Sequence, residues 1–556
     1  MFGIGRTYKN LYRLRQIINV LIRHGFGHFI EKLNLHVFLS PLRRLIGVKR
    51  KEKTGPAGRL RQVLEELGPT FIKFGQVLSS RPDLLPEDFY LELAKLQDKV
   101  TPFPFSQVKE IVEKELGSPL TEIFSQFIEV PFASASIAQV HEAKLKSGEE
   151  VVVKVERPGI QEIISSDIAI LQYLARLAER YIPEARVYNP AGMVNEFSYI
   201  IQQELDFTVE ASHADKIRNF FKGDITIVIP QVFWDYTSPR VLTMEKVKGI
   251  KINDFEALDR AGFDRRKLAF DGVDIFFRQI FDHGFFHADP HPGNIFVLED
   301  GRLAFVDFGM VGRISKNTLK IIARIFAAMV KRDSDEILQG YLALGVLGDE
   351  LDRVSFLREV EELLDLYHDV PLKRIRAEDF FIKMVRLSSR HHLRLPQDFV
   401  LLGKTIFVMG GLGRELYPDF NILEVAEPFA RRLLARRFEP KEIASSMVKA
   451  GEEVISLLAT FPRQWREIMG KLNRGEMKME FEHKGLDNFI MELDRSSNRL
   501  AFSLIIAAII IGSSLIIRID KGPKLFDYPL LGIVGYLMAG ILGLWLVVAI
   551  LRAGKL

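Results

Sequence analysis

The residues best suited to chemistry lie in one short segment and in a tripeptide that follows it. Residues 287–294 read HADPHPGN, and Asp307 begins the tripeptide DFG. Asp289 precedes Asn294 by five positions and Asp307 by 18. Between Asn294 and Asp307, the segment Ile295–Val306 has the pattern of two short strands joined by a turn. Carboxylate and amide oxygens are ligands for Mg²⁺, and a separate aspartate can orient or deprotonate an attacking hydroxyl or water.

This order and spacing is that of the catalytic loop and the magnesium loop in the protein-kinase-like fold. Phosphoryl transfer needs divalent cations to neutralise charge on the γ-phosphate, which makes Asn294 and Asp307 candidate metal ligands. A zinc hydrolase is the alternative, because His287 and His291 have the spacing of a metal pair on a helix. The prolines on either side of His291 disfavour that helix. The spacing therefore favours the kinase-like site.

A kinase-like site also needs an upstream lysine on a strand, which grips the α- and β-phosphates, and a helix carboxylate that holds this lysine. Lys154 lies within the β-branched run Glu150–Val155. The segment before it, residues 132–141, reads FASASIAQVH, where a phosphate-covering loop is expected. Its small side chains let the backbone approach phosphates, although alanine and serine adopt positive φ less freely than glycine. The partner carboxylate is expected within residues 203–211, for which an exposed acidic helix is the alternative reading.

The elements that must position these residues follow from hydrophobic periodicity. Short apolar runs predict further strands at residues 225–229, 241–244, 295–298 and 303–306. Helices are expected over residues 60–125, with breaks at Gly68-Pro69, Arg81-Pro82 and the Pro102/Pro104 pair, and again from about 316 to 470. Strands followed by a long helical half predict an α+β fold.

The two ends of the chain carry membrane signals. Residues 501–517 and 528–551 are uncharged runs of 17 and 24 residues, each long enough to cross a bilayer, with polar residues between them. They predict a transmembrane hairpin; a buried helical hairpin is the alternative. Residues 1–55 hold 12 basic and two acidic residues. Their start predicts an amphipathic helix on an anionic membrane surface. A cleaved transit peptide and a helix packed on the main domain are the alternatives.

Composition excludes several classes of function. The chain has no cysteine, which rules out disulfides, thiolate metal sites and cysteine nucleophiles. Its 47% hydrophobic and 27% charged residues are typical of a globular protein, rather than a disordered or wholly membrane-embedded one. A net charge of +4 is too small to indicate a nucleic-acid partner.

Residues from about 60 to 470 resemble the UbiB (aarF domain-containing) atypical kinase family, which is linked with ubiquinone and prenyl-lipid biosynthesis. The most specific mark is the K-x-G-Q motif at residues 73–76, followed in order by the E-x-D motif at 204–206, the HADPHPGN loop and DFG. Two departures occur in the alanine-rich loop: Ser134 stands where alanine is typical and Ala138 where glycine is common. The resemblance implies a bilobal protein-kinase-like fold, with an N-terminal helical extension over the active site.

The resemblance also implies the site. Lys154 is expected to pair with Glu210, and Lys73 with Glu204 or Asp206. The expected catalytic residues are Asp289, Lys154 and Asn294, and the expected metal ligands are Asn294 and Asp307. The expected nucleotide-binding residues are Ala133, Ser134, Ala135, Ser136, Ile137, Ala138, Gln139, Val140, Lys154, Glu210 and Asp307. The expected regulatory residues are Lys73, Gly75, Gln76, Glu204 and Asp206. ATP and Mg²⁺ are the expected cofactors.

The domain boundaries expected from these patterns are 1–55, 56–125, 126–250, 251–480 and 481–556. The expected protein is a membrane-anchored kinase or ATPase that supports isoprenoid quinone biosynthesis. A bacterial-type inner membrane with the kinase domain in the cytoplasm is expected, with an organelle inner membrane as the alternative. Expected partners are a membrane lipid or quinone precursor, quinone-biosynthesis proteins and a second copy through the hairpin. A protein serine/threonine kinase, a small-molecule kinase and an ATP-dependent scaffold remain alternatives.

Overall fold

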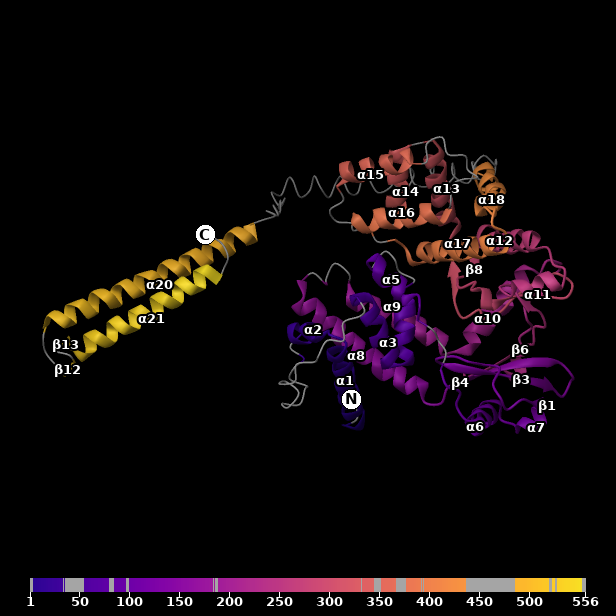
Figure 1. Ribbon diagram of the computed structural model, residues 1–556, viewed down its shortest axis with the longest axis horizontal. Helices are drawn as coiled ribbons and strands as arrows, with labels where there is room; N and C mark the ends of the chain where they lie inside the picture. Colours follow the sequence, from indigo (N-terminus) through magenta and orange to yellow (C-terminus); the bar gives the residue numbers. More distant parts are fainter. Residues whose placement is uncertain are drawn as a thin grey trace, which may run out of the picture. The chain divides into compact units, whose positions relative to one another are not determined.

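The computed structural model describes residues 4–33, 35, 55–79, 85–96, 100–183, 185, 189–331, 333–344, 352–366, 377–391, 393, 395–436, 486–519, 523–525 and 528–552. The chain divides into two units, Met1–Ala444 and Ser445–Leu556 (Figure 1). The break expected at Arg81-Pro82 and the helical pattern expected over 437–470 lie outside the described residues.

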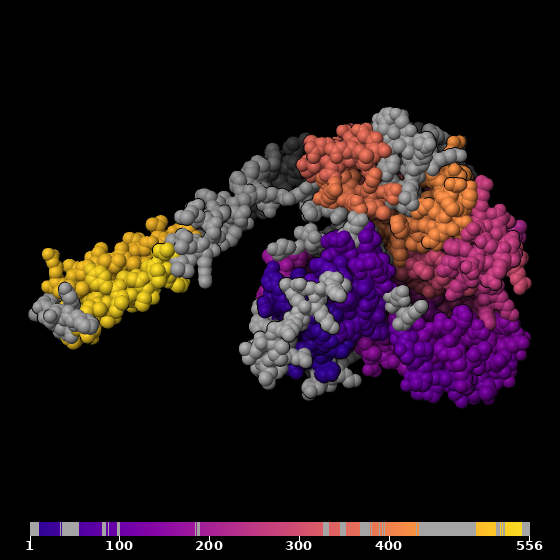
Figure 2. All heavy atoms as spheres, viewed as in Figure 1, coloured from indigo at the N-terminus to yellow at the C-terminus, as the bar shows by residue number. Residues whose placement is uncertain are grey.

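Helices form the start of the first unit. They are α1 (Ile4–Arg23), α2 (Gly27–Lys32), α3 (Pro56–Leu67), α4 (Pro69–Ser79) and α5 (Glu87–Leu93). The boundary between α3 and α4 falls at Gly68, as the Gly68-Pro69 pair predicts. In the space-filling view these helices carry the indigo colour of the N-terminal residues (Figure 2).

The basic helix α1 packs on the protein. Leu14, Ile17 and Ile18 of its apolar face are buried, where α1 contacts α3 and α8 (Ile160–Tyr181). The Arg13 guanidinium donates to both carboxylate oxygens of buried Asp167, at 2.7 and 3.0 Å. The side chains that would enter a membrane surface are therefore occupied, and packing on the main domain is the alternative that the structure supports.

An antiparallel sheet forms the N-lobe. Its strands are β1 (Phe124–Phe127), β2 (Ala133–Ser134), β3 (Ala138–Leu145), β4 (Glu150–Glu156) and β6 (Val241–Glu245), in the order β1-β3-β4-β6 with β2 paired to β3. Helix α6 (Phe105–Leu116) begins directly after Pro104, as predicted, and covers one face with α7 (Leu120–Ile123) (Figure 1). Val151, Val153 and Val155 of β4 are fully buried in the core beneath α6. The strand predicted around Lys154 is confirmed.

The segment predicted as a phosphate-covering loop is a hairpin. Ala133 pairs with Val140 and Ser134 with Gln139, so β3 includes the last four residues of the predicted loop. The sequence masks this strand, because FASASIAQVH lacks the β-branched run that marks β4.

Three helices and two small sheets lead into the C-lobe. The helices are α9 (Pro190–Glu204), α10 (Phe207–Phe220) and α12 (Arg265–Phe281), with the short α11 (Phe255–Arg260) and the 3-10 turn η4 (Trp234–Tyr236). One sheet has the order β5 (Ile227–Val228), β10 (Leu303–Phe305), β9 (Ile295–Val297), β7 (Ile250–Lys251). The other pairs β8 (Phe285–His287) with β11 (Val311–Arg313). The strands predicted at 241–244, 295–298 and 303–306 are confirmed, and the run 225–229 yields a two-residue strand.

The helical half has its own hydrophobic core. It contains α13 (Lys316–Lys331), α14 (Ser334–Ala343), α15 (Arg353–Asp365), α16 (Ala377–Arg390), α17 (Gln397–Leu416) and α18 (Ile422–Arg436). Tyr341 and Phe356 are fully buried and stack edge-on, with ring centroids 5.6 Å apart. Strands before a helical half confirm the predicted α+β, kinase-like class.

The second unit is a helical hairpin. Helices α20 (Leu486–Ile519) and α21 (Leu530–Arg552) are joined through the short β12 (Lys524–Leu525) and β13 (Tyr528–Pro529). Each contains a stretch long and apolar enough to cross a membrane, Ser496–Arg518 and Leu530–Val547. The hydrophobic side chains there are largely exposed, Leu544 to 70%, as a pair of membrane spans requires and a soluble hairpin does not.

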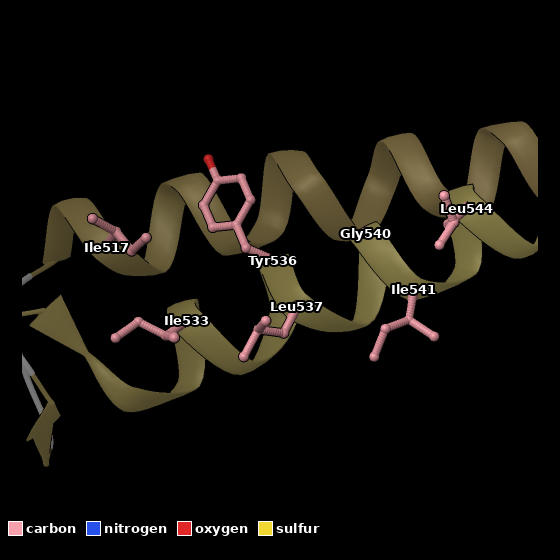
Figure 3. A pocket seen from close by; sticks show the side chains of 7 residues that line it. All are labelled: Ile517, Ile533, Tyr536, Leu537, Gly540, Ile541 and Leu544. Carbon is pink, nitrogen blue, oxygen red and sulfur yellow. The ribbon is translucent and has the colours of Figure 1, made fainter.

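The two helices of this hairpin touch through small residues. A side chain added at Gly535 would place its Cβ 2.0 Å from the Ser513 hydroxyl oxygen. Beside this contact an apolar groove of about 550 Å³ opens along α21 (Figure 3). It is lined by Ile517, Ile533, Tyr536, Leu537, Gly540, Ile541 and Leu544. The groove carries no titratable cluster, so the candidate site for chemistry is in the first unit.

Candidate functional site

The β9–β10 hairpin brings the two proposed metal ligands together. Ile295 pairs with Phe305, and the Val306 amide donates to the Asn294 carbonyl at 2.9 Å. Asn294, the last residue of η5 (Pro292–Asn294), therefore lies beside Asp307. The Asp307 backbone has φ 64°, a left-handed conformation that is rare outside glycine and is concentrated at functional sites.

Lys154 and Glu210 form the ion pair that the sequence resemblance implies. The Lys154 Nζ lies 2.7 Å from Glu210 Oε2. Lys154 is the fifth residue of β4 and Glu210 lies in the first turn of α10, so the pair joins sheet to helix. The Lys154 Nζ is also 5.3 Å from the centre of the Phe207 ring. A lysine held in this way is a fixed cation for phosphate oxygens.

The electrostatics of Lys154 are dominated by nearby acids. Burial by itself lowers the pKa of Lys154, but the carboxylates of Glu210, Asp307 and Glu204 outweigh it and raise that pKa above its ordinary value. Burial likewise opposes ionisation of Asp307, yet the cations Lys154 and Lys73 hold the Asp307 pKa below its ordinary value. Both groups are therefore charged at neutral pH.

Asp289 has a cationic partner that sequence reasoning missed. Lys404 of α17 places its Nζ 3.0 Å from Asp289 Oδ1, across 115 residues of chain. Burial would raise the pKa of Asp289, but the charge of Lys404 and its hydrogen bond keep that pKa below its ordinary value. The Asp289 side chain is 42% exposed, so its carboxylate is both ionised and accessible.

The loop that carries Asp289 is anchored in the core. The backbone N–H of His287 donates to the buried Gln279 side chain at 3.0 Å, and the Asp289 N–H donates to His287 Nδ1 at 3.3 Å. The His287 ring lies 5.3 Å from the Phe308 ring. Burial lowers the pKa of His287, so the ring is neutral in the folded protein. The Nδ1 atoms of His287 and His291 each accept a hydrogen bond from a backbone N–H of their own loop.

The K-x-G-Q residues have two roles: one side chain reaches the candidate site, and two residues pack the extension. Lys73 Nζ lies 2.5 Å from Glu204 Oε1, at the end of α9. Gly75 is the point of closest approach, since an added Cβ would lie 2.3 Å from the Leu96 side chain. The Gln76 side chain donates to the Leu96 carbonyl at 3.3 Å. Lys73 therefore belongs to the site, while Gly75 and Gln76 hold α4 in place.

The partner of Lys73 is Glu204, and Asp206 has a different task. Its carboxylate accepts from the Thr208 backbone N–H at 3.1 Å and from the Thr208 hydroxyl at 2.6 Å, capping the N-terminus of α10. The cap fixes the corner at which α9 ends and α10 begins. Glu204 and Glu210 lie on the two sides of this corner and hold Lys73 and Lys154 respectively.

The alanine-rich hairpin is braced from behind. The Arg157 guanidinium donates to the Ala135 carbonyl at 3.2 Å, and the buried Gln139 side chain exchanges hydrogen bonds with the Phe103 backbone at 3.1 and 3.3 Å. Ser136 is fully buried and its hydroxyl has no hydrogen-bond partner within the described residues. Ala133 is exposed, Ser134, Ala135 and Val140 are half-buried, and Ile137 and Ala138 are buried. The hairpin contributes a small-residue backbone surface, whereas the side chains of Gln139 and Ile137 serve the core.

The donor set fits a magnesium ion that is shared with a nucleotide. Among the described residues no three histidine, aspartate or glutamate side chains form a metal cluster. Asn294 and Asp307 supply two adjacent oxygen donors beside the cation Lys154. Mg²⁺ takes only one or two protein carboxylates when phosphate oxygens and water complete its six ligands. The residues present match this pattern and do not match a site built entirely from protein ligands.

Comparison with known families agrees with this arrangement. Residues 95–341 match the model of the ABC1 atypical kinase-like domain. Residues 360–421 match the UbiB helical domain, and residues 484–552 match the ABC1/UbiB kinase-like C-terminal domain. The second match includes α17 with Lys404, and the third includes both candidate spans.

Relatives align over most of the chain. A Pseudomonas aeruginosa protein named probable protein kinase UbiB is 40% identical over 454 residues, which cover 80% of this chain and 85% of the relative. An uncharacterised Clostridium pasteurianum protein encoded 5′ of hydrogenase 1 is 33% identical over 98% of this chain and its whole length. A solved complex of Rv3197 with erythromycin from Mycobacterium tuberculosis aligns at 26% identity over 67% of this chain and 94% of that one, with a TM-score of 0.46. By its family-model matches and its identity to these bacterial relatives, the chain belongs to the ABC1/UbiB family of atypical kinase-like proteins.

Proposed function

We propose that this protein binds Mg-ATP and turns it over slowly, transferring the γ-phosphoryl group to water or to a small or lipidic acceptor. The observation that carries the proposal is the 2.7 Å pair of Lys154 with Glu210, set in the field of Asp307. Such a pair holds a cation on the phosphates without losing it to solvent. Mg²⁺, held by Asp307 and Asn294, would neutralise charge on the transferred group.

The remaining residues support the transfer step. Asp289 accepts a hydrogen bond from the acceptor hydroxyl and orients its oxygen toward the γ-phosphorus. A bond forms from that oxygen to phosphorus, and the bond from phosphorus to the β–γ bridging oxygen breaks. ADP leaves with the electron pair, while the acceptor proton passes to Asp289 and on to solvent. The ionised, 42% exposed carboxylate of Asp289 suits this role.

The extension and the hairpin support a small or lipidic acceptor over a peptide. Lys73 of α4 reaches Glu204, which places the extension beside the Lys154 and Glu210 pair and would limit access for a peptide. The two candidate spans would keep the kinase-like unit at a membrane surface. We further propose that the hairpin crosses an inner membrane with the first unit on the cytoplasmic side, and that the protein supports isoprenoid quinone synthesis, as the name UbiB of its relatives implies.

Phosphate release by the purified full-length protein in lipid nanodiscs tests the proposed turnover. We expect slow, magnesium-dependent release that falls at least about 100-fold in Asp289→Asn but stays measurable in single turnovers. Asp235→Asn, which alters an exposed acid of η4 that makes none of these contacts, should retain it. ATP binding without release in the unaltered protein would reject turnover and favour an ATP-dependent scaffold. Transfer of label to peptides would favour a protein kinase.

Quinone analysis tests the biological role separately. Cells that lack this protein should contain less isoprenoid quinone and more of its precursors. The unaltered chain should restore the quinone, and Asp289→Asn should not. Unchanged quinone content in the deleted cells would reject the biosynthetic role while leaving the ATP chemistry intact.

A further inference from the structure

Lys404 belongs to a helix outside the kinase-like core and ends at the proposed acceptor-orienting residue. It lies on α17, within the part of the chain that matches the UbiB helical domain, and its Nζ is 3.0 Å from Asp289 Oδ1. The two side chains are 29% and 42% exposed, so the pair lies at an open face and is not sealed inside the core.

A second contact fixes Lys404 against the catalytic loop. The buried hydroxyl of the next residue, Thr405, donates to the Ala288 carbonyl at 3.3 Å and to the Leu401 carbonyl at 2.9 Å. Helix α17 also contacts β11, the strand that follows DFG. The backbone on both sides of the ion pair is therefore held, which makes the pair unlike two mobile surface side chains that meet by chance.

The pair leaves half of the carboxylate available. Lys404 occupies Oδ1 of Asp289, while the described side chains give no hydrogen bond to Oδ2. The other charged or titratable groups that act on Asp289 are His287, which is buried, and Asp307, which repels it. Lys404 is thus the main favourable charge for an aspartate that sits close to another acid.

We propose that Lys404 is a positioning residue for phosphoryl transfer: it fixes one oxygen of Asp289 so that the other oxygen meets the acceptor. The helical domain thereby becomes part of the catalytic apparatus through one side chain. A carboxylate that can rotate, or that turns toward the metal, orients an acceptor poorly, and errors of about 1 Å in such groups cost about 10²-fold in rate. This role rests on the turnover proposed above.

Three variants of the full-length protein in nanodiscs test the role. Lys404→Met removes the charge and keeps the apolar stem, Lys404→Arg restores a cation, and Lys316→Met removes an exposed lysine at the start of α13. Phosphate release is measured against ATP concentration to separate kcat from KM. ATP affinity and melting temperature are measured on the same samples.

We expect kcat to fall by about 10- to 100-fold in Lys404→Met, with KM and ATP affinity within about twofold of the unaltered protein. Lys404→Arg should recover most of kcat, and Lys316→Met should behave as the unaltered protein. In an Asp289→Asn background, Lys404→Met should cause no further loss, because it acts through that carboxylate.

Each contrary result has its own meaning. An unchanged kcat in folded Lys404→Met, or an equal loss in Lys404→Arg and Lys404→Met, would overturn the positioning role while leaving turnover established. If Lys404→Met does not fold, Lys404→Arg in the Asp289→Asn background tests the positioning role instead. A single-turnover rate lower in this double variant than in Asp289→Asn alone would overturn that role. Absence of magnesium-dependent release in the unaltered protein would instead reject the proposed function itself.

Discussion

Asp307 combines a strained backbone with the charge that the site depends on. Its φ of 64° lies in a region that asparagine tolerates better than other side chains, so Asp307→Asn changes the charge while keeping the turn. We expect this variant to lose magnesium-dependent ATP binding, with affinity at least about tenfold weaker, because the one carboxylate of the metal pair is gone.

Calorimetry with and without Mg²⁺ measures that effect. Asp300→Asn is the matched control, since Asp300 lies in the same hairpin and pairs with Arg302 on the surface. Equal Mg-ATP affinity in a folded Asp307→Asn protein would contradict the assignment of Asp307 as a metal ligand.

Lys73 joins the extension to the candidate site through its ion pair with Glu204. Its loss leaves Glu204 unpaired at a site where both side chains are about four-fifths buried, at 17% and 22% exposure, which costs roughly 1–3 kcal/mol. We expect Lys73→Ala to lower the melting temperature, loosen α4 and change the preference between ADP and ATP or raise self-phosphorylation. These properties are measured together, with Lys95→Ala, an exposed lysine of the same extension, as the control.

A fall in melting temperature with no change in nucleotide preference or self-phosphorylation would show that Lys73 is structural. Equal behaviour of the two variants would show that the pair with Glu204 carries no particular weight.

The sequence predicted the ion pairs between residues of known motifs. It did not predict contacts that arise only when distant parts of the chain pack together. Lys154 and Glu210 meet as the motif order implied, and Glu204 was one of two carboxylates expected for Lys73. Lys404 gave no signal, because a lysine within an apolar helix 115 residues away has the pattern of any solvated position.

At the scale of elements, α10 links Lys154 to the DFG segment. Glu210 in its first turn holds Lys154, and one turn later the His213 Nδ1–H donates to the Phe308 carbonyl at 3.1 Å. Burial lowers the pKa of His213, with Arg313 and Lys216 acting in the same direction. The folded protein therefore holds this histidine neutral.

A neutral buried histidine makes stability depend on pH with a defined sign. The folded pKa lies below the unfolded value near 6.5, so stability is fully present above 6.5 and is lost as pH falls below it, by up to about 1.4 kcal/mol per pH unit. We expect the fall in melting temperature between pH 7.5 and 5.5 to be smaller in His213→Asn, which can still donate to Phe308. His287 remains in both proteins, so the comparison isolates His213. An identical fall in both would contradict this role.

Helices α20 and α21 of the C-terminal hairpin approach closely at Gly535. Gly535→Leu should separate α20 from α21, since even its Cβ would collide with Ser513, whereas Gly543→Leu meets nothing within 4 Å and is the matched control. The protein has no cysteine, so single cysteines at Phe502 and Trp545, whose rings are 6.1 Å apart, can be cross-linked without background. We expect cross-linking to drop severalfold in Gly535→Leu alone. Equal yields in both variants would reject the contact.

Periodicity predicted elements best where one pattern dominated. The strand around Lys154, the turn before α6 and the apolar part of each C-terminal helix have clear boundaries in the sequence. Helix α20 nevertheless begins at Leu486, well before the uncharged run at 501–517. β3 was missed because small and polar residues of the alanine-rich hairpin reduce its strand propensity. The N-terminal helix was predicted as a helix, but its partner was not, since an amphipathic face is the same whether it meets lipid or α3.

At the scale of the whole molecule, the hairpin is the proposed anchor. A variant that ends at residue 485 lacks both candidate spans, and we expect it in the soluble fraction after cell fractionation. Because α1 is packed on the first unit, no salt-sensitive attachment should remain, and a wash at 1 M salt, where the Debye length is about 3 Å, should change nothing. A truncated protein that resists carbonate extraction would show that another segment holds the membrane.

The corner between α9 and α10 has a consequence for how this molecule tolerates change. Glu204 pairs with Lys73 of the extension and Glu210 pairs with Lys154 of the N-lobe, and the Asp206 cap sets the turn between the two acids. The separation of the two carboxylates is therefore set by the number of residues in the corner. An insertion or deletion of one residue in the corner would shift Glu204 relative to Glu210, so that the two acids could no longer pair with Lys73 and Lys154 together. The length of the corner is therefore as much a part of the site as the acids themselves.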